Sequence, residues 1–231
     1  MEGTVKANIE RIRNNIAEAR LRTGREASGI RLMAVTKMVD ENRIMEAIEA
    51  GVDIIGENYV QEAKRKIEKL GKPIEWHMIG HLQSNKAKEA VRLFEMVHSV
   101  DRMDLAIELD RRSKALGRVT KILIEVNISG EKTKRGVPQR EAIHLIRNMA
   151  TLENLSIYGL MTMPPWFDDP EKTRPYFVAL RELRDRIIEE QIEGVEMREL
   201  SMGMSADYQV AIEEGATIVR IGRNIFGGRE T

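Results

Sequence analysis

Apolar positions follow two patterns along the chain: in some segments they recur at helical spacing, and in others they form short continuous runs. Val5, Ile9, Ile12 and Ile16 fall at helical spacing, which predicts an amphipathic helix that ends near Gly24. After it, short apolar runs alternate with charged amphipathic segments, and the junctions carry Gly, Asn, Ser or Asp. Alternation of this kind predicts parallel strands that are joined by right-handed helical crossovers.

Eight apolar runs are predicted to be strands. They are RLMAVTK (31–37), VDIIGEN (52–58), IEWHMIG (74–80), EMVHSV (95–100), KILIEVNIS (121–129), LSIYGLM (155–161), MRELSMG (197–203) and TIVRIG (217–222). Seven amphipathic segments between them are predicted to be helices. They span Glu41–Ala50, Asn58–Leu70, Gln83–Leu93, Arg102–Leu116, Pro138–Ala150, Pro175–Glu190 and Ala206–Glu214.

Residues at the ends of these helices support the boundaries. Asp40 precedes the first of them as a suitable N-cap, and Pro138 falls in a first turn, where proline is tolerated. Glycines that can close a helix follow four of the segments, at Gly51, Gly117, Gly194 and Gly215.

Eight strand units match an α/β fold, a closed (β/α)8 TIM-like barrel, and the length of 231 residues suits that fold. A doubly wound open sheet is the alternative that the pattern alone leaves open. No linker or low-complexity segment divides the chain. We therefore predict one domain over residues 1–231, with residues 1–24 as an extra N-terminal helix that packs on the barrel.

Composition and charge exclude several classes of function. The chain has no cysteine, which excludes disulfides and thiolate metal sites. Its 37 acidic and 37 basic side chains cancel, so it lacks the electrostatic footprint of a nucleic-acid or anionic-membrane binder. No apolar run approaches the length of a membrane span, and the N-terminus lacks an apolar signal core. We expect a soluble cytoplasmic protein.

Functional groups of a parallel barrel gather at the carboxyl ends of its strands. The predicted strands end at Lys37, Glu57, Asn58, Gly80, His81, Asn127, Met161, Thr162, Ser201, Arg220 and Gly222. The convergence of so many polar groups on one rim predicts a site there.

Lys37 ends an otherwise apolar run. An amine is a nucleophile only when it is neutral, and desolvation or neighbouring cations at a barrel mouth lower an amine pKa. A lysine in this position is suited to a Schiff base with an aldehyde. The alternative is a solvated lysine that marks the end of a strand.

Two glycine-rich segments follow the last two predicted strands. The first carries Ser201, Gly203 and Ser205, and the second carries Gly222, Arg223, Gly227 and Gly228. Glycine lets a backbone approach an anion, and barrels of this type often bind phosphate after strands seven and eight. We predict a phosphate site, with two ordinary glycine-rich turns as the alternative.

Arg220 lies among apolar neighbours in the last predicted strand, where a charge without a partner is costly. It either forms a structural ion pair or donates to a ligand in the barrel. His77 and His81 lie four residues apart, which is roughly 13 Å along a strand and too far for one metal ion. We predict no metal site, a core position for His77 and a rim position for His81.

Two loops carry further candidates. GEKTKRG holds Lys132, Lys134 and Arg135, and is either a solvated mobile loop or an anion-recruiting segment at the site mouth. MPPWFDDPEKT presents Trp166 and Phe167 as a lid or an interaction surface, and the alternative is a rigid turn that covers its own apolar patch.

Five motifs resemble the pyridoxal phosphate homeostasis proteins in order and spacing. They are AVTK, IGENYVQEA, WHMIGHLQSNK, LSMGMSADYQVAI and VRIGRNIFG, and the resemblance covers nearly the whole chain. That family looks like the barrel domain of bacterial alanine racemase without its second domain. The resemblance implies a barrel of the fold type III class that binds pyridoxal 5'-phosphate (PLP).

The resemblance also implies roles for seven residues. Lys37 would form an internal aldimine with PLP. The phosphate would be held by Ser205, Gly222 and Arg223, with Ser201 nearby. Arg220 would face the pyridine nitrogen, and Asn58 would lie beside the ring.

These roles predict a binding protein rather than an enzyme. An arginine that donates to the ring nitrogen disfavours its protonation and weakens PLP as an electron sink. In the racemases a second base, a tyrosine, comes from a domain that we expect this chain to lack, since only Glu230 and Thr231 follow the last glycine turn. We predict that the protein carries or buffers PLP as the Lys37 aldimine for vitamin B6 homeostasis, as a monomer, with apo PLP-dependent enzymes as candidate recipients.

Three other functions remain as alternatives. The first is a PLP-dependent amino-acid racemase on a single-domain scaffold. The second is a barrel aldolase or isomerase that uses Lys37 on a sugar phosphate. The third is a partner-binding protein that uses the barrel as a scaffold and Trp166 and Phe167 as anchors.

Overall fold

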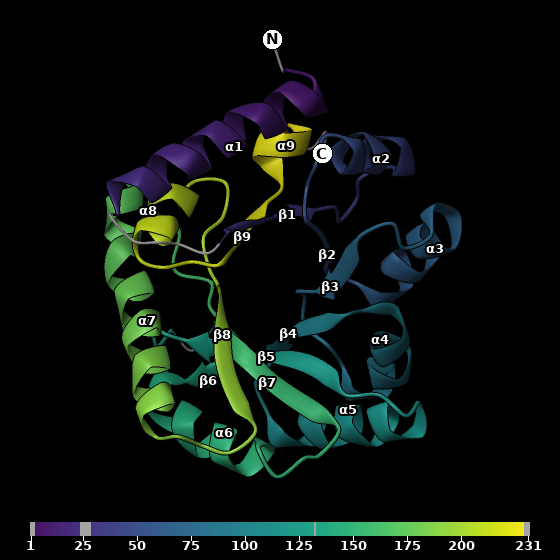
Figure 1. The fold of residues 1–231 in the computed structure, drawn as a ribbon, viewed down its shortest axis with the longest axis vertical. Helices are drawn as coiled ribbons and strands as arrows, with labels where there is room; N and C mark the ends of the chain where they lie inside the picture. The colour runs from purple at the N-terminus through teal and green to yellow at the C-terminus, as the bar shows by residue number, and fades with distance from the viewer. Residues whose placement is uncertain (1–2, 24–28, 132, 229–231) are drawn as a thin grey trace.

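The computed structural model describes residues 3–23, 29–131 and 133–228, so the predicted boundary at Gly24 lies outside the described residues. Helices surround a central ring of strands (Figure 1). The strands are β1 (Arg31–Val35), β2 (Ile54–Glu57), β3 (Glu75–Met78), β4 (Met96–Val100), β5 (Thr120–Asn127), β6 (Val137–Pro138), β7 (Leu155–Met161), β8 (Val195–Ser201) and β9 (Ile218–Ile221). The helices are α1 (Val5–Arg22), α2 (Glu41–Glu49), α3 (Val60–Leu70), α4 (Ala87–Leu93), α5 (Met103–Ala115), α6 (Ala142–Met149), α7 (Arg174–Glu189), α8 (Tyr208–Glu213) and α9 (Arg223–Phe226), with 3₁₀ turns η1 (Ser84–Lys86), η2 (Gln139–Glu141) and η3 (Pro170–Thr173).

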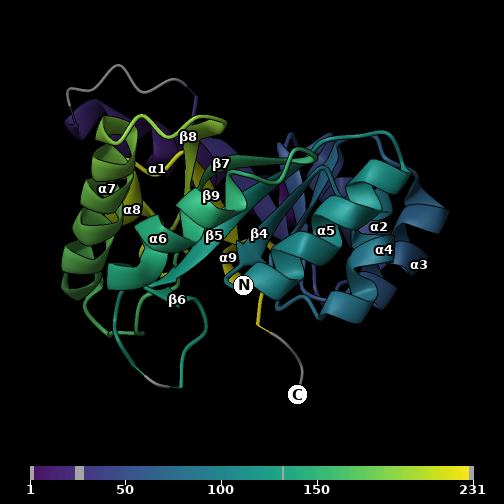
Figure 2. The same cartoon turned by 90° about the horizontal axis from the view of Figure 1, so that it is seen from below.

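The sheet closes on itself. Strands follow the order β4-β3-β2-β1-β9-β8-β7-β5, and a further pairing between β4 and β5 joins the two ends. Every pairing is parallel. The fold is therefore a closed eight-stranded TIM barrel, as predicted, and the open-sheet alternative is wrong. Figure 2 shows the strands tilted between the helices on either side.

The opening helix α1 lies across the C-terminal elements. Thr4 caps it by accepting a hydrogen bond from the Ala7 N–H, and its buried residues include Ile9 and Ile12. Burial of an aliphatic side chain of this size stabilises a fold by about 1.5–3 kcal/mol. The Asn8 side chain donates to the Ile225 carbonyl oxygen over 3.0 Å, which ties α1 to α9.

Two predicted helix starts are wrong. Pro138 is not in a first helical turn, because Val137 and Pro138 pair with the end of β5 as β6, and α6 begins only at Ala142. The last helix was predicted from Ala206 but starts at Tyr208, because the Asp207 carboxylate accepts from the Met204 N–H and closes a turn first.

The short helix α9 was not predicted. It spans only four residues, Arg223–Phe226, and follows Gly222 in a segment that the sequence analysis assigned to a glycine-rich turn. A single turn of helix carries too few positions for a hydrophobic period to appear.

The apolar core has two parts. The larger part fills the space between strands and helices and includes Trp76 and Phe94. Two smaller clusters contain inward-facing residues of the barrel: Met33, Ile54 and Ile218 form one, and Met96, Leu123 and Met161 form the other. Fully buried polar residues, including His77, His98 and Ser201, also occupy the strands.

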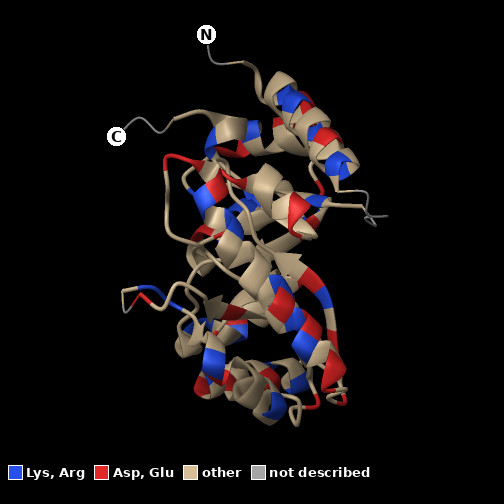
Figure 3. Cartoon of the chain, turned by 90° about the vertical axis from the view of Figure 1, so that its left-hand side faces the viewer, with Lys and Arg blue, Asp and Glu red and all other residues tan. Residues whose placement is uncertain are grey.

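Charged residues of both signs are interspersed along the helices of the side that Figure 3 shows. Within the described part of the chain, no helix combines the length and the apolar character that crossing a membrane requires.

Candidate functional site

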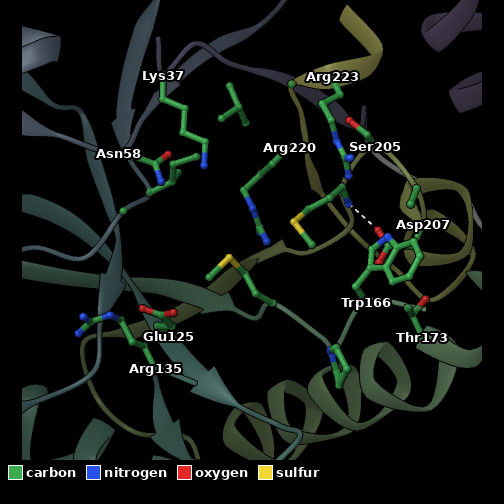
Figure 4. A pocket seen from close by; sticks show the side chains of 18 of the residues that line it. Lys37, Asn58, Glu125, Arg135, Trp166, Thr173, Ser205, Asp207, Arg220 and Arg223 are labelled. Atoms are coloured by element: carbon green, nitrogen blue, oxygen red, sulfur yellow. Dashed lines mark hydrogen bonds between the residues drawn. The ribbon is translucent and has the colours of Figure 1, made fainter. Parts of the chain in front are cut away.

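A pocket of about 380 Å³ opens at the carboxyl ends of the barrel strands (Figure 4). Its volume falls in the range of roughly 300–1,000 Å³ that small-molecule sites occupy. Six of the seven residues singled out by the sequence analysis line it: Lys37, Asn58, Ser205, Arg220, Gly222 and Arg223. The seventh, Ser201, is fully buried and contacts Arg220.

Lys37 follows β1, and its amine points into the pocket (Figure 4). The residues on either side of it are held firmly. Thr36 is buried, and its hydroxyl donates to Glu57 Oε1 over 2.6 Å. Met38 has a left-handed φ of 60°, which is costly for a residue with a side chain, and its N–H donates to Glu62 Oε1 over 2.6 Å.

The buried ammonium group of Lys66 holds the turn around Lys37 in place through three hydrogen bonds. Its Nζ donates to the Thr36 carbonyl oxygen over 2.6 Å and to Glu57 Oε1 and Glu62 Oε1 over 2.7 Å each. The Lys66 and Glu57 side chains are 1% and 0% exposed, so the pair is screened little by water. Burial raises the pKa of Glu57, while the Lys66 charge opposes that shift. No pattern in the sequence singles out Lys66, because a lysine in a helix is ordinarily solvated.

Arg220 extends from β9 into the pocket (Figure 4). Its Nη1 donates to Ser201 Oγ over 2.7 Å and its Nη2 to the Thr162 carbonyl oxygen over 2.8 Å. Both acceptors are neutral, and no carboxylate among the described residues forms an ion pair with it. The structural ion pair that the sequence left open is therefore wrong for this part of the chain.

Burial lowers the pKa of Arg220 to about 10, while Asp207 and Glu125 oppose that shift. The guanidinium thus remains charged at neutral pH. It is only 4% exposed, and hydrogen bonds to Ser201 and Thr162 occupy one edge of it.

Two carboxyl groups of the pocket were missed. Burial, reinforced by the charge of Asp101, raises the pKa of Glu125 to about 7. Burial also raises the pKa of Asp207, whose carboxylate accepts from the Met204 N–H over 2.6 Å. Strand alternation could have found Glu125, because it shares the inward face of β5 with Leu123.

The two glycine-rich segments meet at the end of the pocket where Figure 4 shows Ser205 beside Arg223. The Asn224 side chain donates to the Ser205 carbonyl oxygen over 2.8 Å, and the Asn224 N–H lies 3.4 Å from Ser205 Oγ. Gly227 and Gly228 follow α9 and do not line the pocket. The segments therefore offer a hydroxyl, a guanidinium and an open backbone at one place.

Asn58 lies at the opposite end, next to Lys37 (Figure 4). Its Oδ1 is buried and has no hydrogen-bond partner among the described residues, which leaves a polar atom available to a ligand. A Cβ at Gly80 would approach the Asn58 carbonyl oxygen to 2.3 Å, so only glycine lets β3 end this close to Asn58.

The remaining rim candidates divide into lining and supporting residues. His81 and Arg135 line the pocket, and so do Trp166 and Phe167. Trp166 is 67% exposed, and Phe167 stacks on Tyr176 with ring centroids 6.0 Å apart.

Asn127 and Thr162 support neighbouring segments instead. The Asn127 side chain donates to the carbonyl oxygens of Glu131 and Lys134, and the Thr162 hydroxyl donates to the Val126 carbonyl oxygen over 2.8 Å. Lys132 of the same loop lies outside the described residues.

The two histidines of WHMIGH occupy different surroundings. His77 is fully buried on β3, as predicted, whereas His81 is exposed at the rim. Burial, with the charges of Arg135 and Arg102, lowers the pKa of His81. No group of three or more His, Cys, Asp or Glu side chains in the described ranges could hold a metal ion.

The chain is thus a closed parallel barrel whose pocket, at the carboxyl ends of the strands, is lined by a lysine, three arginines and two glycine-rich segments. The family model with the description "Alanine racemase, N-terminal domain" matches residues 7–230. An alanine racemase of Clostridium difficile shares the fold with a TM-score of 0.76, at 15% identity, over 97% of this chain and 58% of its own length.

Closer relatives match over almost their whole length. The "Pyridoxal phosphate homeostasis protein" of Aquifex aeolicus is 44% identical over 223 residues, which are 96% of this chain and 97% of the relative. A crystal structure of an unknown protein from Bifidobacterium adolescentis has a TM-score of 0.92, 39% identity, and coverage of 96% and 94%. PipY of Synechococcus elongatus, solved with PLP bound, has a TM-score of 0.80, 36% identity, and coverage of 92% and 100%. The chain belongs to the family of pyridoxal phosphate homeostasis proteins.

Proposed function

We propose that the pocket binds PLP, with the Lys37 amine joined to its aldehyde as a Schiff base. Condensation would form a C=N bond and release one water molecule. The observation that carries the proposal is the shared pocket: a lysine amine, a buried arginine and an anion cradle face one cavity of suitable size. PipY, a relative that is 36% identical over nearly the same length, supports it as a protein solved with PLP.

The charges and polar atoms of the pocket fit PLP. Its phosphate carries negative charge, and four Lys or Arg side chains line the pocket against two acidic ones: Lys37, Arg135, Arg220 and Arg223 against Glu125 and Asp207. Ser205, Gly222 and Arg223 would hold the phosphate. The unpartnered Asn58 Oδ1 would lie beside the ring, where the ligand can supply its hydrogen-bond partner.

Arg220 supports storage rather than turnover. When bound, PLP supplies an aldehyde and a pyridine ring that can accept electrons. A charged guanidinium at the ring nitrogen disfavours protonation of that nitrogen, and an unprotonated ring is a weaker electron sink. Because Arg220 keeps its proton at neutral pH, we infer little or no amino-acid turnover.

The relatives support the same role. The Aquifex aeolicus relative, of which this chain covers 97%, is named a homeostasis protein, whereas this chain covers only 58% of the alanine racemase. The proposed protein is a single-domain, cytoplasmic, monomeric carrier or buffer of PLP that releases it to apo PLP-dependent enzymes. The racemase alternative fits these relatives less well.

Reduction of the PLP complex with borohydride tests the site. We expect a visible absorption band when PLP is added to the purified protein, and a reduced pyridoxyl mass on the peptide that contains Lys37. Lys37→Ala should abolish both. Lys86→Ala should retain them, because Lys86 lines a neighbouring pocket and not this one. A label spread over surface lysines, with no band, would show that the proposed site is wrong.

Deuterium exchange separates the carrier from a racemase. L-alanine incubated with the loaded protein in deuterium oxide should keep its α-proton over hours. Exchange of that proton at a rate proportional to protein concentration would favour the racemase alternative.

A further inference from the structure

A line of hydrogen-bonded side chains crosses the barrel interior beneath the pocket and ends at Arg220. Arg220 Nη1 donates to Ser201 Oγ, which lies 3.0 Å from His98 Nδ1. His98 Nε2 lies 2.9 Å from His77 Nδ1. His77 Nε2 lies 3.0 Å from Glu75 Oε2, at the start of β3. The line, which we call the histidine column, thus runs from the pocket to the amino-terminal end of a barrel strand.

The column has little access to water. His77, His98 and Ser201 are 0% exposed, and neither histidine lines the pocket. A buried polar atom without a partner is costly, so the atoms of the column depend on one another for their hydrogen bonds. Only Glu75 reaches solvent, and there it also pairs with Arg31.

Glu75 at one end of the column and Arg220 at the other determine which atom donates in each of its hydrogen bonds. Hydrogen bonds from His77 and Arg31 hold the pKa of Glu75 at about 2, so Glu75 is an ionised acceptor at neutral pH. His77 must therefore carry its proton on Nε2. Burial lowers the pKa of His77, so this ring is neutral and its Nδ1 is an acceptor.

The same reasoning continues to the pocket. His98 must donate from Nε2 to His77, and because burial lowers its pKa well below the usual value, its Nδ1 is an acceptor. Ser201 must then donate its hydroxyl proton to His98. A hydroxyl oriented in this way presents its lone pairs to Arg220, which can only donate.

We propose that His98 and His77 are positioning residues that fix, through the Ser201 hydroxyl, the direction in which Arg220 enters the pocket. The Thr162 carbonyl oxygen holds the second Nη group, so the guanidinium is anchored at two points. This inference rests on the proposed function, in which Arg220 meets the PLP ring nitrogen. Without His98, the Ser201 hydroxyl is free to rotate, and Arg220 loses its oriented acceptor.

Imidazole ¹⁵N chemical shifts of the ligand-free protein test the column itself. At pH 7 we expect His77 and His98 to be neutral, with the proton on Nε2 in each ring. His98→Gln should leave the His77 tautomer unchanged, because Glu75 still determines it. A charged ring, or a proton on Nδ1 of either histidine, would overturn the proposal whether or not the protein binds PLP.

Affinity for PLP tests the effect on Arg220. His98→Phe keeps a ring but removes both nitrogens, and we expect it to raise the Kd for PLP on the order of tenfold, as loss of a hydrogen bond to a charged group does. His98→Gln retains a donor and an acceptor and should recover part of that loss. Met96→Leu alters the same inward face of β4 without a polar atom, and it should bind PLP as the wild type does.

Thermal unfolding of each ligand-free variant separates positioning from general damage. We expect His98→Phe to bind PLP more weakly even at temperatures where it is fully folded. Equal affinity in His98→Phe and wild type, or equal loss in Met96→Leu, would overturn the positioning role. Absence of PLP binding by the wild type would instead refute the proposed function, and the ¹⁵N shifts would still decide whether the column exists as described.

Discussion

Gly203 and Gly222 lie in the two glycine-rich segments that we propose to hold the phosphate, but they are glycine for different reasons. Gly203 has a φ of +90°, and a Cβ there would lie 2.5 Å from the Ala211 Cβ. Gly222 has an ordinary φ of −115°, and its nearest neighbour would be the Val35 carbonyl oxygen at 3.5 Å, which is normal contact. The fold therefore requires the first glycine and tolerates a side chain at the second.

We predict opposite results for alanine at these two positions. Gly203→Ala should destabilise the fold by about 2 kcal/mol or more, because strain and overlap add. Gly222→Ala should leave stability unchanged or raise it by about 0.4–1 kcal/mol, and it should weaken PLP binding because the backbone can no longer approach the phosphate closely. Urea unfolding and PLP titration measure both effects. Wild-type affinity for PLP in a folded Gly222→Ala variant would show that the phosphate does not bind at this residue.

The link between α3 and the end of β1 is the feature that matters at the scale of elements. Lys66 on α3 bonds to Thr36 and to two buried or half-buried carboxylates, and so holds the turn that carries Lys37. Removing one partner of a buried charge pair leaves the other uncompensated, which typically costs about 3–5 kcal/mol. An exposed pair on the same helix is worth only about 0–1 kcal/mol.

Lys66→Met should therefore destabilise the protein by about 3 kcal/mol or more in urea unfolding. Lys64→Met is the matched control, because Lys64 lies on the same helix and its pair with Glu89, at 3.7 Å, is exposed. Adding Glu57→Gln to Lys66→Met should restore part of the lost stability, since it removes the unpaired charge. Equal effects of Lys64→Met and Lys66→Met would contradict this role for the buried ammonium.

At the scale of the whole molecule, the pocket imposes a pH dependence on stability. Glu125 is 4% exposed, and its pKa is raised from 4.5 to about 7. A carboxyl with a raised folded pKa stabilises the fold below its unfolded pKa, and that contribution is lost as pH rises through the folded pKa. The loss should occur between about pH 4.5 and 7 and amount to on the order of 3 kcal/mol.

Glu125→Gln should remove this part of the pH dependence and make the protein more stable than the wild type at pH 8. Urea unfolding at pH 5 and pH 8 measures the change, with Glu10→Gln, on the exposed face of α1, as the matched charge control. A Glu125→Gln variant that follows the wild-type curve at both pH values would refute the assignment.

The sequence by itself determined the eight strand units and most of the pocket residues, and it favoured the barrel over an open sheet. Local periodicity encodes each strand and helix, and a parallel barrel brings all carboxyl strand ends to one rim, so Lys37, Asn58 and Arg220 could be assigned to one site from their positions in the chain. The four-residue α9 and the short β6 were not predicted, because they contain too few residues for a hydrophobic period to appear.

Only the tertiary structure decided what holds these residues in place. His98 and Ser201 are 103 positions apart, and Lys66 reaches back 30 positions to Thr36. Which inward-facing side chains meet inside a barrel depends on the register and tilt of strands that are distant in sequence, and no local pattern records those quantities. The burial that shifts the pKa values of Glu125 and Arg220 arises in the same way, because it is a property of the closed barrel and not of the strand on which each residue lies.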